Sequence, residues 1–411
     1  MKNLLIIGFV WPEPSSTAAG KRMLQIIELF LEENYNITFV STATKNKTSF
    51  PLENLGITTF NIELNNNSFD ELILQVNPSI VLFDRYLTEE QFGWRILENC
   101  PKALKILDTE DLHFLRYARK TALKKNSTNF KEFIRNDITL RELASIYRCD
   151  LTLIISQFEL DLLIEEFNLD TSLLCYLPFL LNSIEHKKMH IYPSFNERAH
   201  FMTIGNFRHE PNYNAVLNLK NNIWPLIKNK LPKAEMHVYG AYASEKVYQL
   251  QNVKDHFFIK GWIENSEEAY INSRICLAPI QFGAGLKGKL IESMQFGTPN
   301  ITTTIGAEGM FNGLNWNGFI ENDAEKFADK AIELYENQKI WLQSQENGVN
   351  IINNCFSKEK YGLLFSENVN FILNHLEKHR QNNFIGLMLS HHKMKSTKYL
   401  SKWIEEKNKN L

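Results

Sequence analysis

The order of segments along the chain predicts an α/β protein built from two doubly wound domains that face each other across a cleft. Short apolar runs recur, and each is followed by a polar loop and a segment with helical spacing, which is the order of strand, crossover helix and parallel strand. The chain has 411 residues, about three times the length of a typical domain, so two domains are expected. Several runs are apolar on both faces, as a sheet covered by helices on both sides requires.

The first domain is expected to span residues 1–185. Its predicted strands lie at residues 4–10, 37–42, 57–62, 80–83, 105–108, 151–155 and 173–177. The first run is short and is broken by Pro12 and Pro14, which suits a buried strand leading into a loop better than a secretory signal peptide. We therefore expect a cytoplasmic protein.

The second domain is expected to span residues 196–356. Its predicted strands lie at residues 200–204, 236–239, 257–259, 275–278 and 300–303. The preceding stretch, residues 182–198, has little periodicity and carries His186, Lys187 and Lys188, so it is the candidate linker. In doubly wound sheets ligands bind at the carboxyl ends of the strands, so the loops that follow the strands should line the cleft.

Composition and charge exclude several classes of protein. The formal net charge of -2 provides no global positive field to gather nucleic acid. The five cysteines are far apart and include no C-x-x-C pair, so we expect reduced, mostly buried thiols and no zinc site. No apolar run approaches the length of about 18 residues that a membrane span requires. Because the net charge is close to zero, any site that binds an anion must depend on a local cluster of positive groups.

A glycine-rich loop that leads from a predicted strand into a helix, at residues 279–299, is the most informative segment. Its glycines let the backbone approach a ligand, the amides of the helix N-terminus point at an anion, and its lysines suit phosphate. A glutamate in the helix can accept hydrogen bonds from the hydroxyls of a ribose. The residues expected to bind a nucleoside diphosphate are Gly283, Gly285, Lys287, Lys289 and Glu292. The alternative is a simple turn with solvated lysines and a glutamate that complements the helix dipole.

This segment resembles the donor-site signature of the glycosyltransferase family 4, or group 1, transferases of GT-B fold. Residues 283–310 read GAGLKGKLIESMQFGTPNITTTIGAEGM. Residues 11–22 resemble the first-strand loop of such enzymes, and residues 205–207 resemble the start of their second domain. The resemblance implies two Rossmann-like domains, a UDP- or GDP-linked sugar donor held mainly by the second, and an acceptor held mainly by the first. It also implies a retaining transfer without an obligatory metal or other cofactor.

The resemblance further implies roles for individual residues. Glu292 matches the second glutamate of the family's E-x7-E motif, which binds the donor ribose, and Lys287 or Lys289 would hold the pyrophosphate. The first glutamate of the motif falls at Ala284, so this sequence departs from the pattern and the contact with the donor sugar must come from elsewhere. Glu308, in a later glycine-containing loop, is expected to contact the sugar and partly replace that carboxylate.

The loop after the fifth predicted strand carries three carboxylates and a histidine beside the expected cleft. His113 and Asp111 are candidate catalytic residues, because such groups orient an acceptor hydroxyl or stabilise charge at the anomeric carbon, and transferases of this kind commonly place a histidine or acid there. The alternative is a capping cluster, with Asp108 or Thr109 as the N-cap of a helix and Glu110 and Asp111 in its first turn.

Two further residues are candidate donor ligands. Gly20 lies where a loop enters a helix, so backbone amides there can approach the donor phosphates from the first domain, although Ser15, Ser16 or Thr17 can simply cap that helix. Arg208 follows the first strand of the second domain and is a candidate phosphate ligand, with a surface ion pair as the alternative.

The C-terminal part is expected to contain a helix at residues 357–377 that packs back on the first domain, followed by a basic tail at residues 378–411. Phe384, Tyr399 and Trp403 are interleaved with the charges of the tail. Those charges are Arg380, Lys393, Lys395, Lys398, Lys402, Lys407 and Lys409, against Glu405 and Glu406. Such a segment can lie on an anionic membrane surface at the inner face of the membrane, and the alternative is a surface helix with a frayed end.

The sequence therefore predicts a retaining glycosyltransferase of the hexosyltransferase type, acting on a glycan or lipid-linked acceptor in bacterial-type surface glycan synthesis. Two alternatives remain, a nucleotide-sugar epimerase of the same fold and a non-catalytic protein that binds sugar nucleotides or glycans. A nicotinamide dehydrogenase is disfavoured, because the first strand leads into Pro-Glu-Pro and not into G-x-G-x-x-G.

Overall fold

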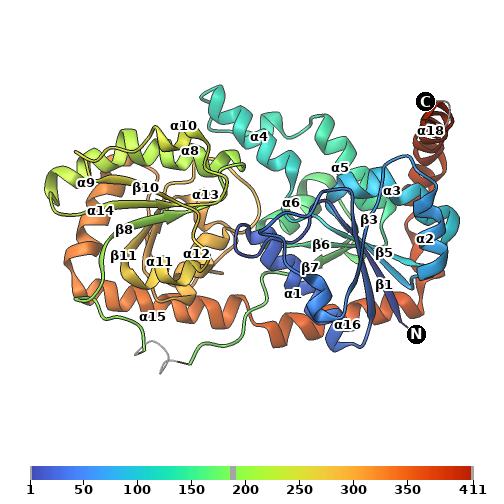
Figure 1. Cartoon of the computed structure of the whole chain (residues 1–411), viewed down its shortest axis with the longest axis horizontal. Helices are drawn as coiled ribbons and strands as arrows, with labels where there is room; N and C mark the ends of the chain where they lie inside the picture. Colours follow the sequence, from blue (N-terminus) through green and yellow to red (C-terminus); the bar gives the residue numbers. More distant parts are fainter. Residues whose placement is uncertain (1, 186–190, 409–411) are drawn as a thin grey trace.

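The fold consists of two parallel β-sheets, each flanked by helices, that lie side by side along the long axis of the molecule (Figure 1). The computed structural model describes residues 2–185 and 191–408. Thus His186, Lys187 and Lys188 of the predicted linker lie outside the described residues. The predicted fold class, two doubly wound α/β domains facing across a cleft, is confirmed.

The first sheet has seven strands in the order β3-β2-β1-β4-β5-β6-β7. All of its pairings are parallel. The strands are β1 (Asn3–Gly8), β2 (Asn36–Ser41), β3 (Thr58–Asn61), β4 (Ile80–Asp84), β5 (Leu104–Asp108), β6 (Leu151–Ile154) and β7 (Leu174–Tyr176). The direction of the strand order reverses between β1 and β4, so the loops after these two strands diverge and leave a crevice at the carboxyl ends of the strands.

Helices cover both faces of this sheet because its strands are apolar on both sides. In β1, Leu4 and Ile6 belong to one hydrophobic cluster, and Leu5 and Ile7 belong to the cluster on the opposite face. The helices are α1 (Ala18–Glu32), α2 (Ser68–Val76), α3 (Arg85–Asn99), α4 (His113–Lys124), α5 (Asp137–Arg148) and α6 (Gln157–Phe167). Short 3-10 turns lie at Leu52–Leu55, Phe130–Phe133 and Thr171–Leu173.

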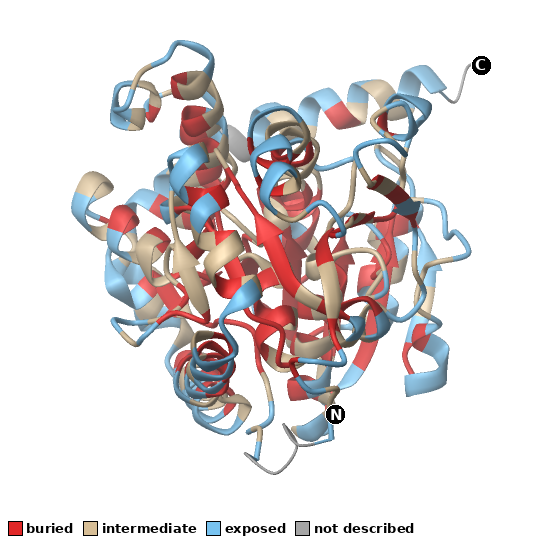
Figure 2. Cartoon of the chain, turned by 90° about the vertical axis from the view of Figure 1, so that its left-hand side faces the viewer, coloured by how far each residue is buried: buried red, intermediate tan, exposed pale blue. Residues whose placement is uncertain are grey.

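The second sheet has six parallel strands in the order β10-β9-β8-β11-β12-β13. The strands are β8 (Ala199–Ile204), β9 (Met236–Tyr239), β10 (Phe257–Gly261), β11 (Ser273–Ala278), β12 (Asn300–Thr302) and β13 (Gly318–Ile320). Sequence patterns did not predict β13, because it is a three-residue edge strand that begins with glycine and is only partly buried. Viewed from this end of the molecule, the buried strands lie between layers of helix (Figure 2).

The helices of the second domain vary in length and regularity. They are α8 (Glu210–Asn218), α9 (Trp224–Lys230), α10 (Glu245–Tyr248), α11 (Ser266–Asn272), α12 (Gly288–Gln295), α13 (Thr304–Ala307), α14 (Ala324–Glu336) and α15 (Gln338–Cys355), with a π-helical turn at Leu219–Ile223. The helix α12 begins directly after the glycine-rich loop that follows β11, so it presents its N-terminus to the edge where the strands end.

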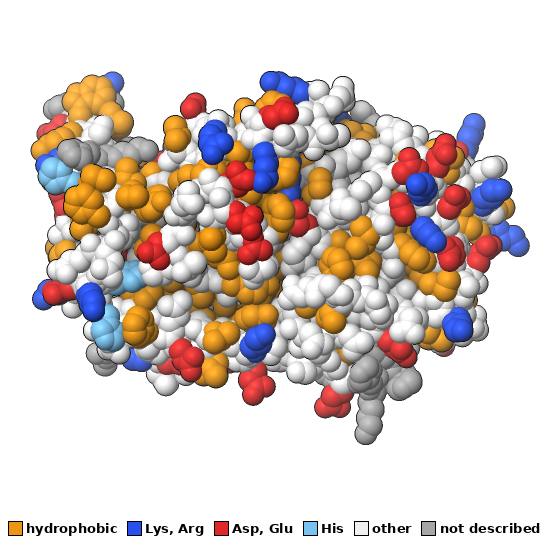
Figure 3. Space-filling model, turned by 180° about the vertical axis from the view of Figure 1, so that it is seen from behind, with side chains coloured by type: hydrophobic (Ala, Val, Ile, Leu, Met, Phe, Trp, Pro, Cys, Tyr) orange, Lys and Arg blue, Asp and Glu red, His pale blue; other side chains and the backbone are white. Residues whose placement is uncertain are grey.

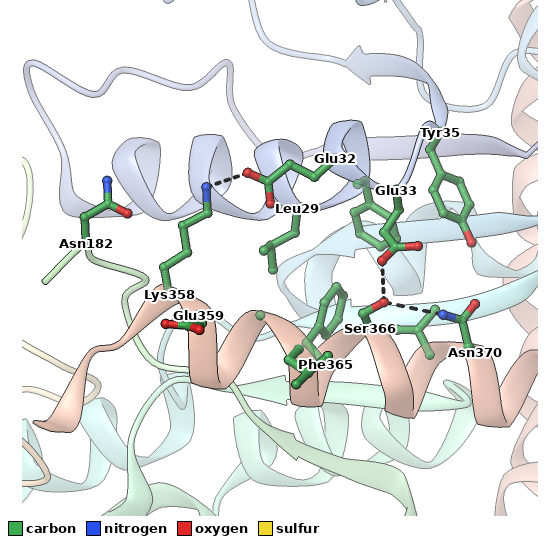
Figure 4. Close-up of a pocket in the computed structure, with 14 residues that line it drawn as sticks. Leu29, Glu32, Glu33, Tyr35, Asn182, Lys358, Glu359, Phe365, Ser366 and Asn370 are labelled. Atoms are coloured by element: carbon green, nitrogen blue, oxygen red, sulfur yellow. Dashed lines mark hydrogen bonds and ion pairs between the residues drawn. The ribbon is translucent and has the colours of Figure 1, made fainter. Parts of the chain in front are cut away.

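The chain then returns to the first domain through α16 (Lys358–Asn374), α17 (Leu376–Asn382) and α18 (Phe384–Asn408). A hollow of about 370 Å³ lies between α16 and the end of α1 (Figure 4). There Lys358 Nζ lies 2.7 Å from Glu32 Oε1, and the Ser366 hydroxyl donates to Glu33 Oε1 at 2.7 Å. These contacts fasten α16 to the C-terminal end of α1.

Two further sequence expectations concern cysteines and membrane spans. The five cysteines are all buried and none forms a disulfide. Within residues 2–185 and 191–408, no helix has the combination of length and apolar character needed to cross a bilayer.

Candidate functional site: a cleft between the two sheets

A cleft of about 530 Å³ lies between the two domains. The loops that follow β1, β4 and β5 line it on one side, and the loops that follow β8, β9, β10 and β11 line it on the other. The sequence-predicted residues that line it are Gly283, Gly285, Lys287, Lys289, Glu292, Arg208, Asp111 and His113. Residues predicted from separate halves of the sequence therefore meet in one cavity.

Two helix N-termini converge in this cleft. A Cβ atom on Gly288, at the start of α12, would lie 2.6 Å from the Cβ atom of Ala18, at the start of α1, so only a glycine lets the two helices approach this closely. Both helix dipoles thus direct their positive ends at the same space, which favours an anion.

Gly20 has a structural reason for being glycine. A Cβ atom there would lie 2.5 Å from the backbone nitrogen of Glu13, in the loop that enters α1. Its amide donates to the Thr17 hydroxyl at 2.9 Å, so Thr17 is the N-cap, as one of the sequence alternatives proposed. Its neighbours Ala19 and Lys21 line the cleft, whereas Gly20 is outside the described lining.

Three lysines lie at this convergence. The ammonium group of Lys287 donates to the carbonyls of Ala284 at 3.2 Å and Gly285 at 2.6 Å, and that of Lys289 donates to Asn212 Oδ1 at 2.8 Å. Burial lowers the pKa of Lys287 to about 8 and that of Lys289 to about 8. Bringing an anion beside them would favour their charged forms.

Glu292 projects from α12 into the cleft and pairs with Lys21 of α1, across the domain boundary. Its side chain is 15% exposed, so a ligand can reach it. The third lysine of the site is therefore held by the carboxylate that the sequence assigned to ribose binding.

The glycine-rich loop is held from the first domain by a buried carboxylate. Glu159 Oε1 accepts from the amide of Gly285 at 2.8 Å and from the amide of Leu112 at 3.0 Å. Burial, followed by the charge of Asp111, raises the pKa of Glu159 to about 7, and its Oε2 has no hydrogen-bond partner among the described residues. Gly285 has φ of +62°, and a Cβ atom on it would lie 2.9 Å from the Cβ atom of Asp111. Both the backbone conformation and the close approach of the first domain therefore require glycine at this position.

Arg119 makes a second cross-domain attachment. Its guanidinium donates to the Gly283 carbonyl at 2.9 Å and to Glu308 Oε2 at 2.7 Å. Glu308, expected at the donor sugar, thus neutralises a buried arginine, and it is not among the described residues that line the cleft. The expected contact of Glu308 with the donor sugar stays a prediction, and it would require the Arg119 pair to open.

The loop after β5 is not the capping cluster that one alternative proposed. The N-cap of α4 is Leu112, whose side chain makes no capping hydrogen bond. The amides at the start of α4 instead donate to side chains that are remote in the sequence. Glu142 of α5 accepts from the amides of His113 at 3.2 Å and Phe114 at 3.0 Å, and Glu159 accepts from Leu112. Burial raises the pKa of Glu142 to about 8.

Asp111 and His113 line the cleft, and neither caps α4. The carboxylate of Asp111 pairs with Arg116 and lies 3.5 Å from His113 Nε2. Burial alone would raise the pKa of Asp111, but the Arg116 guanidinium and His113 hold it well below its usual range. Burial lowers the pKa of His113 to about 3, so its imidazole is neutral at physiological pH and serves as a hydrogen-bonding group.

Several cleft residues were missed by sequence reasoning. Arg85 directly follows β4 and has φ of +70°, His209 follows β8, and Trp262, 47% exposed, follows β10. Each stands just beyond a strand's carboxyl end, which was the available signal. Arg208, which was predicted, stacks on Tyr242 with its guanidinium carbon 3.7 Å from the ring centroid, and it is exposed.

Residues 198–337 match the model of the family described as glycosyl transferases group 1. The resemblance to group 1 transferases is thereby confirmed over this part of the chain, which includes the glycine-rich loop and α12. No curated protein sequence matches the chain.

Several solved structures share the fold over most of the chain. Sucrose-phosphate synthase from Thermosynechococcus elongatus is 13% identical with a TM-score of 0.64, covering 91% of this chain and 100% of its own. TarM from S. aureus, in complex with fondaparinux, alpha-GlcNAc-glycerol and UDP, is 10% identical with a TM-score of 0.68, covering 91% and 100%. Anabaena HepE, in complex with UDP and glucose, is 10% identical with a TM-score of 0.63, covering 90% and 100%. At these identities the likeness shows the fold, which is GT-B.

Proposed function

We propose that this protein is a retaining glycosyltransferase that moves a sugar, of hexosyl type, from a nucleoside-diphosphate donor to an acceptor hydroxyl. The observation that carries the proposal is the convergence of the N-termini of α1 and α12 with Lys287 and Lys289 in one interdomain cleft. A departing diphosphate develops negative charge, and prearranged amides, helix dipoles and lysines stabilise that charge without reorganisation.

The donor would lie mainly on the second domain. Glu292 would accept hydrogen bonds from the ribose hydroxyls and release Lys21 to the phosphates. The exposed ring of Trp262 offers a surface on which a nucleobase stacks. Since the TarM and HepE structures are both complexes with UDP, a UDP-sugar is the first donor to test, with a GDP-sugar second.

The acceptor would lie mainly on the first domain, beside Asp111 and His113. A neutral His113 can accept a hydrogen bond from an acceptor hydroxyl, and the carboxylate of Asp111, 3.5 Å from His113 Nε2, would stabilise positive charge at the anomeric carbon. The amides and lysines would take the charge of the diphosphate, so we propose a transfer that needs no metal or other cofactor. A growing surface glycan or lipid-linked sugar in the cytoplasm is the proposed acceptor class.

Calorimetry with UDP and GDP tests the donor site. The Glu292→Ala variant should bind UDP about 10- to 100-fold more weakly, since a charge-assisted hydrogen bond contributes about 1.5–3 kcal/mol. The matched control is Glu325→Ala, an exposed glutamate in the first turn of α14 of the same domain, which should leave affinity unchanged. Unchanged UDP and GDP affinity in Glu292→Ala would remove the ribose role.

Turnover assays separate the three candidate activities. A transferase should release UDP from a UDP-sugar only when an acceptor is present, and NMR of the product should show the anomeric configuration of the donor. A change in the sugar without an acceptor would identify an epimerase. Tight donor binding without turnover across a broad acceptor panel would identify a non-catalytic binding protein.

A further inference from the structure

The C-terminal helix α18 carries large apolar side chains on its solvent side. Phe384 is 66% exposed, Tyr399 is 66% exposed and Trp403 is 61% exposed. Exposed apolar side chains along the same helix also include Ile385, Leu387, Met388 and Leu400. Scattered exposed apolar residues are ordinary, but these side chains gather in two groups on one helix, at residues 384–388 and 399–403, and such groups are typical of an interaction site.

Part of this exposed set shares one face of the helix, whereas Leu387 and Leu400 lie outside it. At 100° per residue, Phe384, Met388, Lys395, Tyr399 and Trp403 fall within an arc of about 100°. Figure 3, which shows the molecule from behind, has hydrophobic side chains on the surface at the end formed by the first domain.

The opposite face of α18 packs on the first domain largely through polar contacts. Ser401 is buried, Glu405 pairs with the buried guanidinium of Arg95 from α3, and Lys398 pairs with Glu98. An ordinary surface helix turns its apolar stripe inward and its charges outward. The arrangement in α18 is the reverse, so its outer face lacks the apolar environment that its rings favour.

Positive charge lies beside the rings. The helix α18 contains five lysines and two glutamates, and two of these lysines, Lys398 and Lys402, pair with the acidic side chains of Glu98 and Glu405. Lys407 Nζ lies 5.4 Å from the centroid of the Trp403 ring, and Lys395 lies on the exposed arc, 3.3 Å from His391. Aromatic rings flanked by lysines suit the boundary between lipid headgroups and acyl chains, where the rings bury and the ammonium groups reach the anionic headgroups.

We propose that α18 docks the protein on an anionic lipid bilayer through its Phe384, Met388, Tyr399 and Trp403 face. The helix is about 37 Å long, so it can lie along the membrane plane. It sits at the end of the first domain that is farthest from the second sheet (Figure 1), which leaves the cleft and the second domain clear of the bilayer. This surface would bring the acceptor-binding domain to lipid-linked substrates, although lipid binding itself does not depend on the proposed transferase activity.

Co-sedimentation with vesicles of phosphatidylcholine, with and without phosphatidylglycerol, tests the proposal. The full chain should bind the anionic vesicles, and higher salt should weaken binding. The double variant Tyr399→Ala/Trp403→Ala should lose most of the binding. The double variant Lys395→Gln/Lys407→Gln should bind about thirtyfold more weakly, from about 1 kcal/mol per lysine. The matched aromatic control is Tyr117→Ala, which removes a ring 47% exposed on α4 and should bind like the unaltered chain.

The side chains in the variants are exposed, so unchanged circular dichroism and UDP affinity will show that folding and the donor site are intact. Failure of the full chain to bind anionic vesicles would overturn the proposal. So would equal binding by all variants. A shift from dimer to monomer in the aromatic variant, without vesicle binding by the unaltered chain, would instead assign the face to a second copy of the protein and overturn the lipid proposal.

Discussion

Removing the Glu159 carboxylate should open the cleft. Its Oε1 accepts from Leu112 within the first domain and from Gly285 in the second, and both bonds are buried. In the Glu159→Ala variant both bonds are lost, and each is of the charge-assisted kind that contributes about 1.5–3 kcal/mol. Only the bond to Gly285 distinguishes closed from open domains. Its loss should therefore shift the closed-to-open equilibrium about 10- to 100-fold toward the open form.

Glu142→Ala is the matched control. Glu142 is a buried carboxylate that caps the same helix, α4, through His113 and Phe114, but it makes no contact across the cleft among the described residues. Both variants should lose thermal stability, because both leave amides at the start of α4 unpaired. Only Glu159→Ala should lengthen the distance between the domains.

Pulsed electron paramagnetic resonance can measure the distance between the domains, with nitroxide labels at Leu140→Cys on α5 and Val253→Cys in the second domain. Both positions are more than half exposed, and the native cysteines are buried, so labelling should be selective. The measurement belongs at pH 8 or above, since the pKa of Glu159 is about 7. Identical distance distributions and identical UDP affinities for Glu159→Ala and Glu142→Ala would refute the clamp.

Two further predictions concern pH and the glycine-rich loop. UDP affinity should fall about tenfold or more between pH 7 and 9.5, because the pKa values of Lys287 and Lys289 are each about 8 and the charged forms bind phosphate; calorimetry across this range checks it, and a flat profile would contradict it. Gly285→Ala should lower donor turnover far more than Gly313→Ala in steady-state assays. Both glycines have positive φ, at +62° and +77°, but only a Cβ atom at 285 meets the first domain, and equal effects would show that φ alone matters.

Much of the fold follows from local patterns. The predicted strands all exist, within a few residues of their expected bounds, because runs such as Ile80–Asp84 are apolar on both faces and end at polar loops. The glycine-rich loop and α12 were also predictable, since glycines, lysines and the strand before them are contiguous. The family match over residues 198–337 includes this loop and α12 and supports their prediction.

The partners of the site residues were not predictable in the same way. Lys21 and Glu292 are 271 positions apart, and Arg119 and Glu308 are 189 apart. Local periodicity specifies which face of a helix is apolar, but it does not specify which charged group another domain will bring near. Sequence reasoning therefore assigned Glu308 to a sugar, while the structure pairs it with an arginine.

The sequence by itself determined two α/β domains, a glycine- and lysine-rich loop suited to phosphate, and a basic aromatic tail. These features depend on side-chain periodicity and on the chemistry of residues that are neighbours in the sequence. Only the tertiary structure decided that the N-termini of α1 and α12 meet, that Glu142 and Glu159 cap α4, and that α18 turns its rings to solvent. Each of these depends on how buried polar groups find partners across the packed domains, since an unpaired buried amide or charge is costly wherever its partner lies in the chain.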